Sequence, residues 1–416
     1  MTPGTREAGA AIVIDDSPPV PLFVRRSSAC PLDPAEEFTR LRAEEPVVRV
    51  TLSTGASAWM VTRYADARRV VADQWRFSSR AAVDGPIPPP EPPGGFPPPR
   101  PGFFSTYAPR EHARVRGMLN AEFGARRLRA LRPRIEAVAD EQVEAVRRSW
   151  PRADLIADFA LPVPARIFFE LLGIPEPDRE RLRRDVDILL DFTPRPREQA
   201  VAFAELDTYM SAFVSRCRRD PGDGDGLVGR LISSYGADLS DTEIAGIAAQ
   251  LLLAGYATTA GAIGLGALLL LRHPDQAAAL REGTADVGRA VEEVLRHLSV
   301  VSFGKVFTAE EDVTVGGQEI RAGEYVLCSL PSANHDAGLG PDADRFDITR
   351  EPLPHLAFGH GARYCLGAEL ARLELRICVP RLLNRFPGLR LDVPFEELRF
   401  TPMNAAYSLE SLPVSW

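Results

Sequence analysis

The chain has 416 residues, of which 45% are hydrophobic and 25% are charged, and its formal net charge is -8. Such a composition is typical of a soluble protein with a large core, and the acidic balance gives no reason to expect a nucleic-acid partner. The five cysteines show no CxxC spacing, which argues against a disulfide framework, a zinc site or an iron–sulfur cluster. Their scatter suits a reducing cytoplasm.

The N-terminal part is expected to be a mobile leader, residues 1–27, ahead of a single domain, residues 28–416. Residues 1–19 carry acids without a basic-then-apolar pattern, so we find no signal peptide and predict a cytoplasmic protein. Three predicted elements follow: a helix over 31–45, a small hairpin sheet over 47–61 and a helix over 64–71.

A proline-rich segment comes next, with ten prolines in the sixteen residues 86–101. A run of this kind is extended and polyproline-like. Composition alone makes it a linker between domains. A stiff loop over a binding site is the alternative.

Helical patterns fill the middle of the chain. We predict six helices there, over residues 110–123, 127–150, 164–172, 177–190, 197–219 and 227–235. Pro194 and Pro196 separate the fourth from the fifth, because two prolines so close together cannot continue a helix. The last third of the chain changes to short alternating segments with turn residues, so the predicted fold class is mainly α, of the α+β type.

Residues 244–271 contain no charged side chain and are long enough to span a bilayer. The preceding residues 240–243, Ser-Asp-Thr-Glu, form a capping-box pattern that predicts a helix start. A helix that is apolar all round also suits the buried axis of a large soluble protein. We expect that second arrangement and no membrane contact.

Cys365 lies in the run Phe-Gly-His-Gly-Ala-Arg-Tyr-Cys-Leu-Gly, residues 358–367. A helical pattern over 366–383 follows, so Cys365 comes just before a helix N-terminus. Free backbone N–H groups there stabilise a thiolate and lower its pKa, and a thiolate is a strong iron ligand. The alternative is a buried free cysteine in a glycine-rich turn.

The run resembles the haem-binding signature of the cytochrome P450 superfamily at all of its constrained positions, which are Phe358, Gly359, Gly361, Arg363, Cys365 and Gly367. The resemblance extends from about residue 31 to the C-terminus. It implies the cytochrome P450 fold, a large helical domain with a small β-rich region around a buried haem b. Cys365 would be the iron ligand, Phe358 would shield the thiolate, and Gly361 and Gly367 would allow close backbone approach.

The resemblance also assigns cations to the haem propionates. His112 and Arg116 match an H-x-x-x-R pattern on one helix face, and Arg363 is the third partner. A solvated basic face is the alternative for the first two, because arginines crowd this region. Many relatives carry a further arginine where this chain has Phe307, and our hypothesis is that Lys305 replaces it.

Glu293 and Arg296 form an E-x-x-R pair on one helix face. Alone, such a pair is common on protein surfaces. The resemblance implies that a second arginine completes a buried Glu-Arg-Arg network, and the spacing assigns Arg345. This role is structural, since bidentate guanidinium–carboxylate bonds would lock the core on the cysteine side.

Residues 254–259, Ala-Gly-Tyr-Ala-Thr-Thr, resemble the oxygen-activation motif of the family. Gly255 and the hydroxyl of Thr258 would open a helix kink for dioxygen and water. Ala257 stands where the family's acid should be, so protons must come from water, the substrate or Thr258. Alternatively, Thr258 is bonded only to its own helix backbone.

The resemblance implies a haem-thiolate monooxygenase that hydroxylates or epoxidises a small apolar secondary metabolite with O2 and two electrons. Because the chain has no flavin, nicotinamide or iron–sulfur region, a separate ferredoxin and ferredoxin reductase are implied. Ala257 keeps open an oxidative coupling or ring-forming enzyme without oxygen insertion. A peroxygenase would need an arginine in the central helix, and a catalytically silent haem protein would also tolerate Ala257.

The sequence is compatible with two kinds of substrate, a free small molecule and a molecule tethered to a carrier protein. The expected pocket residues are mostly small and apolar: Leu253, Ala254, Val300, Val301, Phe303, Asn404, Ala405 and Tyr407. By the resemblance, the proline-rich segment covers the distal haem face, with substrate contacts expected from Ile87, Phe96, Phe103 and Phe104.

Overall fold

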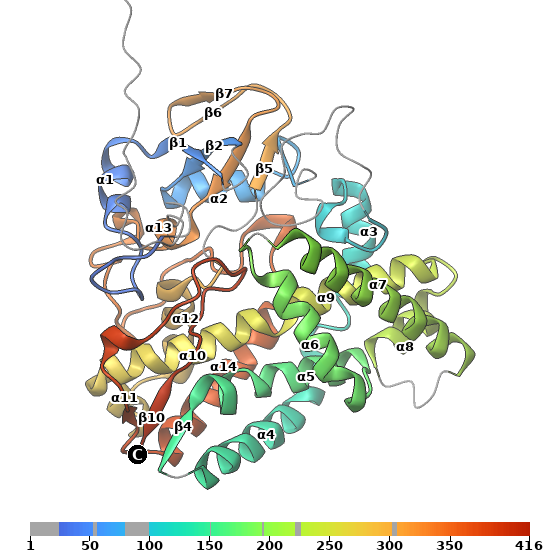
Figure 1. Cartoon of the computed structure of the whole chain (residues 1–416). Helices are drawn as coiled ribbons and strands as arrows, with labels where there is room; N and C mark the ends of the chain where they lie inside the picture. Colours follow the sequence, from blue (N-terminus) through green and yellow to red (C-terminus); the bar gives the residue numbers. More distant parts are fainter. Residues whose placement is uncertain are drawn as a thin grey trace, which may run out of the picture.

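The computed structural model describes residues 25–52, 56–79, 100–149, 151–193, 195–220, 226–301 and 306–416. Within these ranges a large helical body carries a smaller β-rich region on one side (Figure 1). The prediction of a mainly α protein with a small β-rich region is therefore confirmed.

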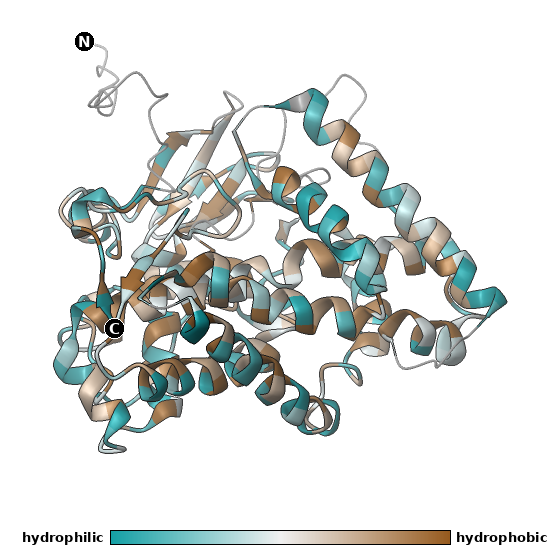
Figure 2. Cartoon of the chain, turned by 60° about the horizontal axis from the view of Figure 1, so that its bottom comes forward, coloured by the Kyte–Doolittle hydropathy of each residue, from teal (hydrophilic) through white to brown (hydrophobic). Residues whose placement is uncertain are grey.

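The helices account for most of the described chain. They are α1 (Glu37–Glu44), α2 (Tyr64–Ala72), α3 (Pro109–Leu119), α4 (Ala125–Arg148), α5 (Pro162–Leu172), α6 (Glu176–Leu190), α7 (Pro196–Arg219), α8 (Leu227–Tyr235), α9 (Asp241–Gly255), α10 (Ala257–Arg272), α11 (Pro274–Arg281), α12 (Val287–Leu298), α13 (Leu330–Asn334) and α14 (Ala368–Arg385). In Figure 2, hydrophilic and hydrophobic stretches alternate along the outer helices, as expected for amphipathic helices packed on a core.

The strands form three small sheets within the described residues. The largest has the order β1-β2-β8-β5-β3, and only the pair β2 and β8 is parallel. The second has the order β4-β10-β9, and β6 pairs with β7. The strands are β1 (Val47–Thr51), β2 (Ser57–Val61), β3 (Phe77–Ser78), β4 (Arg152–Asp154), β5 (Val306–Ala309), β6 (Val313–Val315), β7 (Gln318–Ile320), β8 (Tyr325–Cys328), β9 (Arg390–Leu391) and β10 (Pro413–Ser415).

The central helix run, α9 and α10, starts as its sequence predicts. Ser240 accepts a hydrogen bond from the backbone N–H of Glu243, and the Glu243 carboxylate accepts one from the backbone N–H of Ser240. Asp241–Arg272 is the one run among the described residues that is long and apolar enough to cross a membrane, yet 72% of its apolar window is buried inside the protein. Its composition is that of a core helix.

The predicted boundary of the leader is wrong at its last residues, and residues 1–24 lie outside the described part. Arg26 is buried, and its Nη2 donates to the carbonyls of Leu298 and Ser299 at 2.8 and 3.0 Å. Its guanidinium also lies 4.5 Å from the ring centroid of Tyr407. The end of α12 leaves these carbonyls without helical partners, and Arg26 satisfies them.

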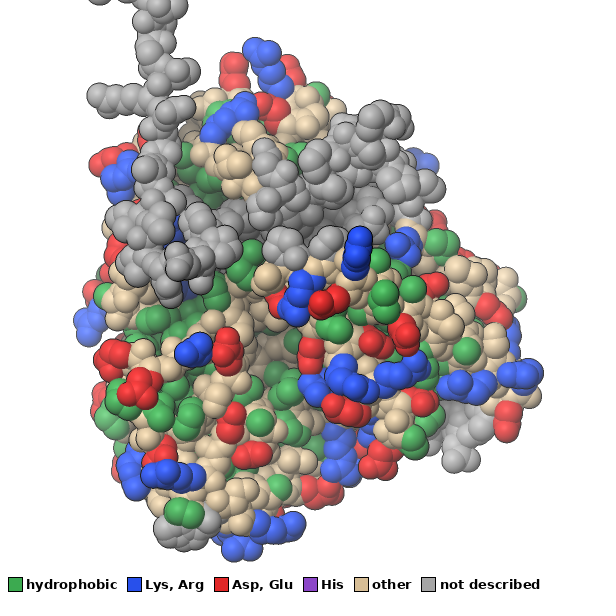
Figure 3. All heavy atoms as spheres, viewed as in Figure 1, with side chains coloured by type: hydrophobic (Ala, Val, Ile, Leu, Met, Phe, Trp, Pro, Cys, Tyr) green, Lys and Arg blue, Asp and Glu red, His purple; other side chains and the backbone are tan. Residues whose placement is uncertain are grey.

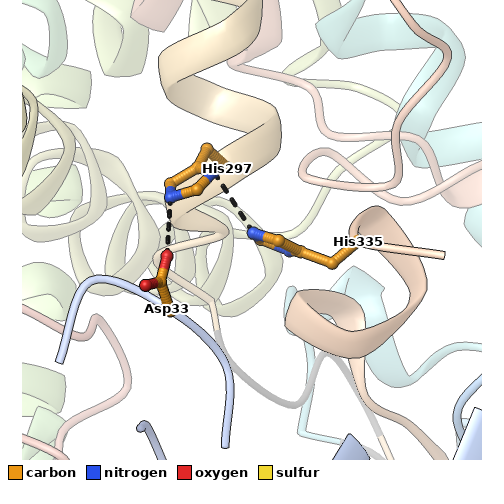
Figure 4. A group of neighbouring side chains, drawn as sticks. All are labelled: Asp33, His297 and His335. Atoms are coloured by element: carbon orange, nitrogen blue, oxygen red, sulfur yellow. Dashed lines mark hydrogen bonds and ion pairs between the residues drawn. The ribbon is translucent and has the colours of Figure 1, made fainter. Parts of the chain in front are cut away.

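A row of three side chains also ties the N-terminal segment to the core (Figure 4). Nε2 of His297 lies 3.0 Å from Oδ1 of Asp33, and its Nδ1 lies 3.2 Å from Nε2 of His335. Nδ1 of His335 donates to the carbonyl of Pro331 at 2.8 Å. One nitrogen or oxygen of each side chain lies within 4.8 Å of the others, and the two contacts of the His297 ring order the three groups in a row.

This row predicts acid sensitivity. Burial lowers the pKa of His335 well below its ordinary value of 6.5, and the neighbouring charges of His297 and Arg296 act in the same direction. Below pH 6.5 the unfolded chain therefore binds more protons than the folded one. The free energy of unfolding consequently decreases as the pH is lowered, by up to about 1.4 kcal/mol per pH unit. We expect urea unfolding from about pH 7.5 to about pH 5.5 to show a shallower decline in His335→Gln than in the parent.

His273→Gln is the control, because it removes a half-buried histidine just after the C-terminus of α10. It should keep the parent's pH dependence. An unchanged slope in His335→Gln would show that another group causes any acid sensitivity.

Candidate active site

A cavity of about 370 Å³ lies between the central helix run and the cysteine loop, residues 358–367. Its lining is largely apolar, and no Asp or Glu takes part among the described residues. Figure 3 shows one face of the molecule, where basic and acidic side chains are interspersed and hydrophobic side chains border a hollow near the middle. This volume lies within the usual range for a single small ligand, which is about 300–1,000 Å³.

The cysteine loop presents its thiol to this cavity. The backbone N–H of Cys365 donates to the carbonyl of Phe358 at 2.9 Å, and α14 begins three residues after the thiol. Gly359 and Gly361 have φ values of 70° and 74°, which side chains rarely tolerate. The glycine spacing of the run therefore serves the tight turn that places Cys365 at the cavity wall.

The pKa of Cys365 differs from the sequence-based prediction. Burial by the surrounding protein raises it, although the backbone N–H groups of Gly367 and Ala368 and the charge of Arg116 oppose this. The helix-terminal N–H groups are present, but desolvation outweighs them. A cation bound to the sulfur would reverse the balance, since a coordinated thiol loses its proton.

The two signature glycines predicted to approach the cofactor have different roles. A Cβ on Gly361 would lie 3.0 Å from Cα of Ala72, and Gly361 does not line the cavity, so it serves the contact with α2, and its cofactor role stays a prediction. Gly367 does line the cavity, and a Cβ there would meet no atom within 4 Å. This open space beside Cys365 suits a flat group lying over the loop.

The three predicted cations, His112, Arg116 and Arg363, all line the cavity. Arg363 donates from Nη1 to the carbonyl of Ser105 at 3.0 Å and from Nη2 to that of Tyr107 at 2.5 Å. Burial lowers its pKa to about 10.

These cations leave donors for an anionic ligand. Nε of Arg363 is buried without a hydrogen-bond partner among the described residues, so it has a donor to offer. Nε of Arg116 donates to Asn120 at 3.1 Å. Two guanidinium groups, a histidine and no lining carboxylate among the described residues suit a ligand with carboxylate groups. Lys305 lies outside the described residues.

The central helix run breaks at Tyr256, between α9 and α10, as the motif predicts. Gly255 and Thr258 line the cavity, whereas Ala257 does not and packs against the core. The hydroxyl of Thr258 donates to the carbonyl of Ala254 at 3.2 Å, the alternative considered from the sequence. A Cβ on Gly255 would lie 2.2 Å from Cζ of Phe168, so glycine lets this ring reach the cavity wall.

The buried network contains Glu293 and Arg296 as predicted. Arg296 is 1% exposed, donates to both carboxylate oxygens of Glu293 at 2.7 and 2.8 Å, and donates from Nη1 to the carbonyls of Asn334 and Ala343 at 2.6 Å each. The two bonds from Nη1 join α12 to two segments far along the chain. The guanidinium of Arg296 therefore acts inside the core and not at the protein surface.

The prediction for Arg345 is wrong. Its side chain is exposed, and it contributes only its backbone carbonyl, which accepts from Nη2 of Arg296 at 3.0 Å. The second guanidinium beside Glu293 belongs to Arg350, whose Nε lies 3.2 Å from the carboxylate. The burial of Phe346 and Ile348 turns the segment so that the later arginine points inward. The sequence did offer Arg350 as a second candidate, because it lies only five residues after Arg345.

The predicted substrate residues are only partly brought together. Ala254, Val300 and Val301 line the cavity, as does Phe104 of the segment after the proline-rich run. The other predicted residues do not line it or are not described: Leu253, Asn404, Ala405, Tyr407 and Phe103 are absent from the wall, and Phe303, Ile87 and Phe96 lie outside the described residues.

For Tyr407 the prediction is wrong, because its hydroxyl donates to the carbonyl of Pro31 at 2.8 Å and its ring is buried. Phe103 instead packs against Phe203 of α7, with ring centroids 5.9 Å apart. Sequence reasoning missed Phe168 and Gln250, which do line the cavity. Gln250 could have been found from the sequence, because it is a polar residue in the charge-free run 244–271. Phe168 could not, because its contact with Gly255 joins segments that are distant in sequence.

Comparisons with known proteins agree with this geometry. The family model Cytochrome P450 matches residues 185–396. Cytochrome P450 165B3 of Amycolatopsis orientalis is 40% identical over 97% of this chain and 100% of its own length. The solved complex of the X-domain and OxyB from teicoplanin biosynthesis is 40% identical, with a TM-score of 0.80 over 96% of this chain and 100% of that chain. CYP105P1 in complex with filipin I is 36% identical, with a TM-score of 0.86 over 94% of this chain and 97% of that chain.

Proposed function

This chain belongs to the cytochrome P450 family, and we propose that it is a haem-thiolate monooxygenase of secondary metabolism that oxidises a largely apolar substrate. The observation that carries the proposal is the position of Cys365, which opens into a cavity with a mostly apolar wall. Family membership makes it an oxidoreductase that uses haem. The haem b form, the substrate class and the redox partners are part of the proposal.

The residues of the cavity fit the cofactor. Cys365 would ligate the iron, Gly367 leaves room beside it, and His112, Arg116 and Arg363 would bind the carboxylates. When bound, haem supplies the activation of O2 with electrons from outside the chain. We propose a separate ferredoxin and its reductase as the electron source, and a cytoplasmic location.

Within the described residues, the distal wall has hydroxyl and amide groups but no acid. Oγ1 of Thr258 donates to Ala254 and keeps its lone pairs for a proton donor such as water. Gln250 and Thr259 are the other polar side chains of α9 and α10 that line the cavity. Protons must therefore pass through water or come from the substrate, with Thr258 orienting the last donor.

A second candidate is oxidative coupling or ring formation without oxygen insertion. It is favoured by the absence of any acid among the described lining residues and by the similarity to OxyB, which is from teicoplanin biosynthesis and was solved with an X-domain. Under this candidate the substrate would be held by a carrier protein. Product mass separates the two: insertion adds one oxygen atom derived from O2, whereas coupling removes two hydrogen atoms.

The first test is an optical titration of the purified ferric protein with free polyketides, terpenoids, alkaloids and peptides, and with carrier-bound peptides. A blue shift of the Soret band by a free compound would support a free small-molecule substrate. A shift only with carrier-bound peptides would favour the second candidate. A reduced carbon monoxide complex without the thiolate signature would contradict both.

Ala257→Glu tests the proton route. If proton delivery limits the parent, the added carboxyl is expected to raise the rate of product formation about tenfold, less than the roughly 100-fold or more that a fully positioned general acid contributes, and to raise the share of electrons found in product. Ala257→Gln has the same size without a titratable proton and should behave like the parent. Equal electron coupling in all three proteins would show that proton delivery is not limiting.

A further inference from the structure

A connected group of charged side chains lies beside the cysteine loop. Arg372 of α14 donates from Nε and Nη2 to the two carboxylate oxygens of Glu292 in α12, at 2.8 and 2.9 Å. Its Nη1 donates to the hydroxyl of Tyr364 at 2.8 Å and to Glu369 at 2.9 Å. Only 12% of the Arg372 side chain and 19% of the Glu292 side chain are exposed. A bidentate pair of this kind holds the guanidinium in one orientation.

His355 holds the other side of Glu292. The backbone N–H of Ala357 donates to its Nδ1 at 3.2 Å, so in the neutral ring the proton is on Nε2, which donates to Glu292 at 3.1 Å. Burial acts to raise the pKa of Glu292, but the hydrogen bonds from His355 and Arg372 lower it to about 2. The carboxylate is therefore charged at neutral pH.

Arg372 also reaches toward the thiol. Its Cζ lies 4.6 Å from the ring centroid of Phe358, a cation over an aromatic face. Phe358 in turn accepts the backbone hydrogen bond of Cys365. Arg372 also donates to the hydroxyl of Tyr364, the residue directly before Cys365, at 2.8 Å. The sulfur therefore lies in the field of a fixed cation, whose own counter-ion is Glu292.

We propose that Arg372 is a positioning residue whose charge, held in place by Glu292, controls how much electron density Cys365 donates and so sets the reduction potential of the haem. This inference rests on the proposed ligation by Cys365. A positive charge beside the sulfur withdraws density from the metal bond and favours the state with one more electron. Removing Arg372 should make the haem harder to reduce, and removing the charge of Glu292 should make it easier.

The test is a spectroelectrochemical titration of haem-loaded Arg372→Met, Glu292→Gln and Arg372→Lys. We expect the potential to fall in the first, to rise in the second and to stay near the parent in the third, which keeps the charge. Shifts of about threefold to tenfold in the reduction equilibrium are expected, where tenfold is about 59 mV for one electron. Arg376→Met is the matched control, because Arg376 is 41% exposed and lies 3.5 Å from Glu292.

Arg372→Met and Glu292→Gln break the same ion pair, so a merely structural role would move the potential in the same direction in both. Parallel shifts, or none, would overturn the inference. If Arg372→Met does not retain haem, a rise in Glu292→Gln without a change in Arg372→Lys supports it, and any other result overturns it. The carbon monoxide spectrum of the parent tests the proposed ligation separately, since its failure refutes the function itself.

Discussion

Replacing Arg296 with Met is expected to lower the free energy of unfolding by about 3–5 kcal/mol, because the Glu293 carboxylate loses its bidentate partner while it stays buried. The same change leaves two backbone carbonyls, of Asn334 and Ala343, without the donor that Arg296 supplies. Each unsatisfied buried group adds about 1–3 kcal/mol, so haem-loaded protein should also accumulate poorly in cells. Urea unfolding of the haem-loaded protein is the measurement.

Two variants make this expectation specific. Arg350→Met removes the second, half-buried guanidinium beside Glu293 and is expected to cost less than Arg296→Met. Arg345→Met removes an exposed side chain and should change stability by no more than about 0.5 kcal/mol. If Arg345→Met were as costly as Arg350→Met, the assignment of the network to Arg350 would be refuted.

Cys365→Ser is expected to abolish the thiolate signature of the reduced carbon monoxide complex and to lower turnover at least about 100-fold, or about 2.7 kcal/mol of transition-state stabilisation. The physical reason is that a serine hydroxyl in this position does not ionise as a thiol bound to iron does, so the electron donation that favours dioxygen cleavage is lost. Optical spectra and substrate turnover with a reducing system provide the measurement.

Cys217→Ser is the control, since this half-buried cysteine lies on α7, away from the cysteine loop. It should keep both the spectrum and the turnover. Equal loss in the two variants would show that the effect is a general response to cysteine substitution. A Cys365→Ser protein that kept the thiolate signature would refute the ligand assignment.

Local sequence patterns predicted the elements that local interactions determine. Residues 227–235 were expected as a helix and form α8 with the same bounds, and the hairpin over 47–61 pairs as β1 and β2. The Ser240 capping box starts α9 as expected, since both of its hydrogen bonds lie within four residues. The first helix was overestimated: it begins at Glu37, because residues 27–33 form a turn in which Ser27 accepts from two backbone N–H groups.

The incorrect predictions concern contacts between segments distant in sequence. Arg345 and Arg350 have the same residue type, and only the packing of the segment on the core decides which one meets Glu293. Tyr407 looked like a pocket residue from its position near other small residues, but its partners Arg26 and Pro31 come from the other end of the chain. The pKa of Cys365 depends on how much protein surrounds the loop, which no local motif encodes.

The buried anchorage of Arg26 has a consequence for the order of folding. Its partners are the carbonyls at the end of α12 and the ring of Tyr407, and Tyr407 binds Pro31 across 376 residues of sequence. During synthesis the N-terminal segment leaves the ribosome first but finds these partners only when nearly the whole chain has emerged. Its docking is therefore a late step with a large loop-closure cost, and it joins the two ends of the domain once the helical body between them has formed.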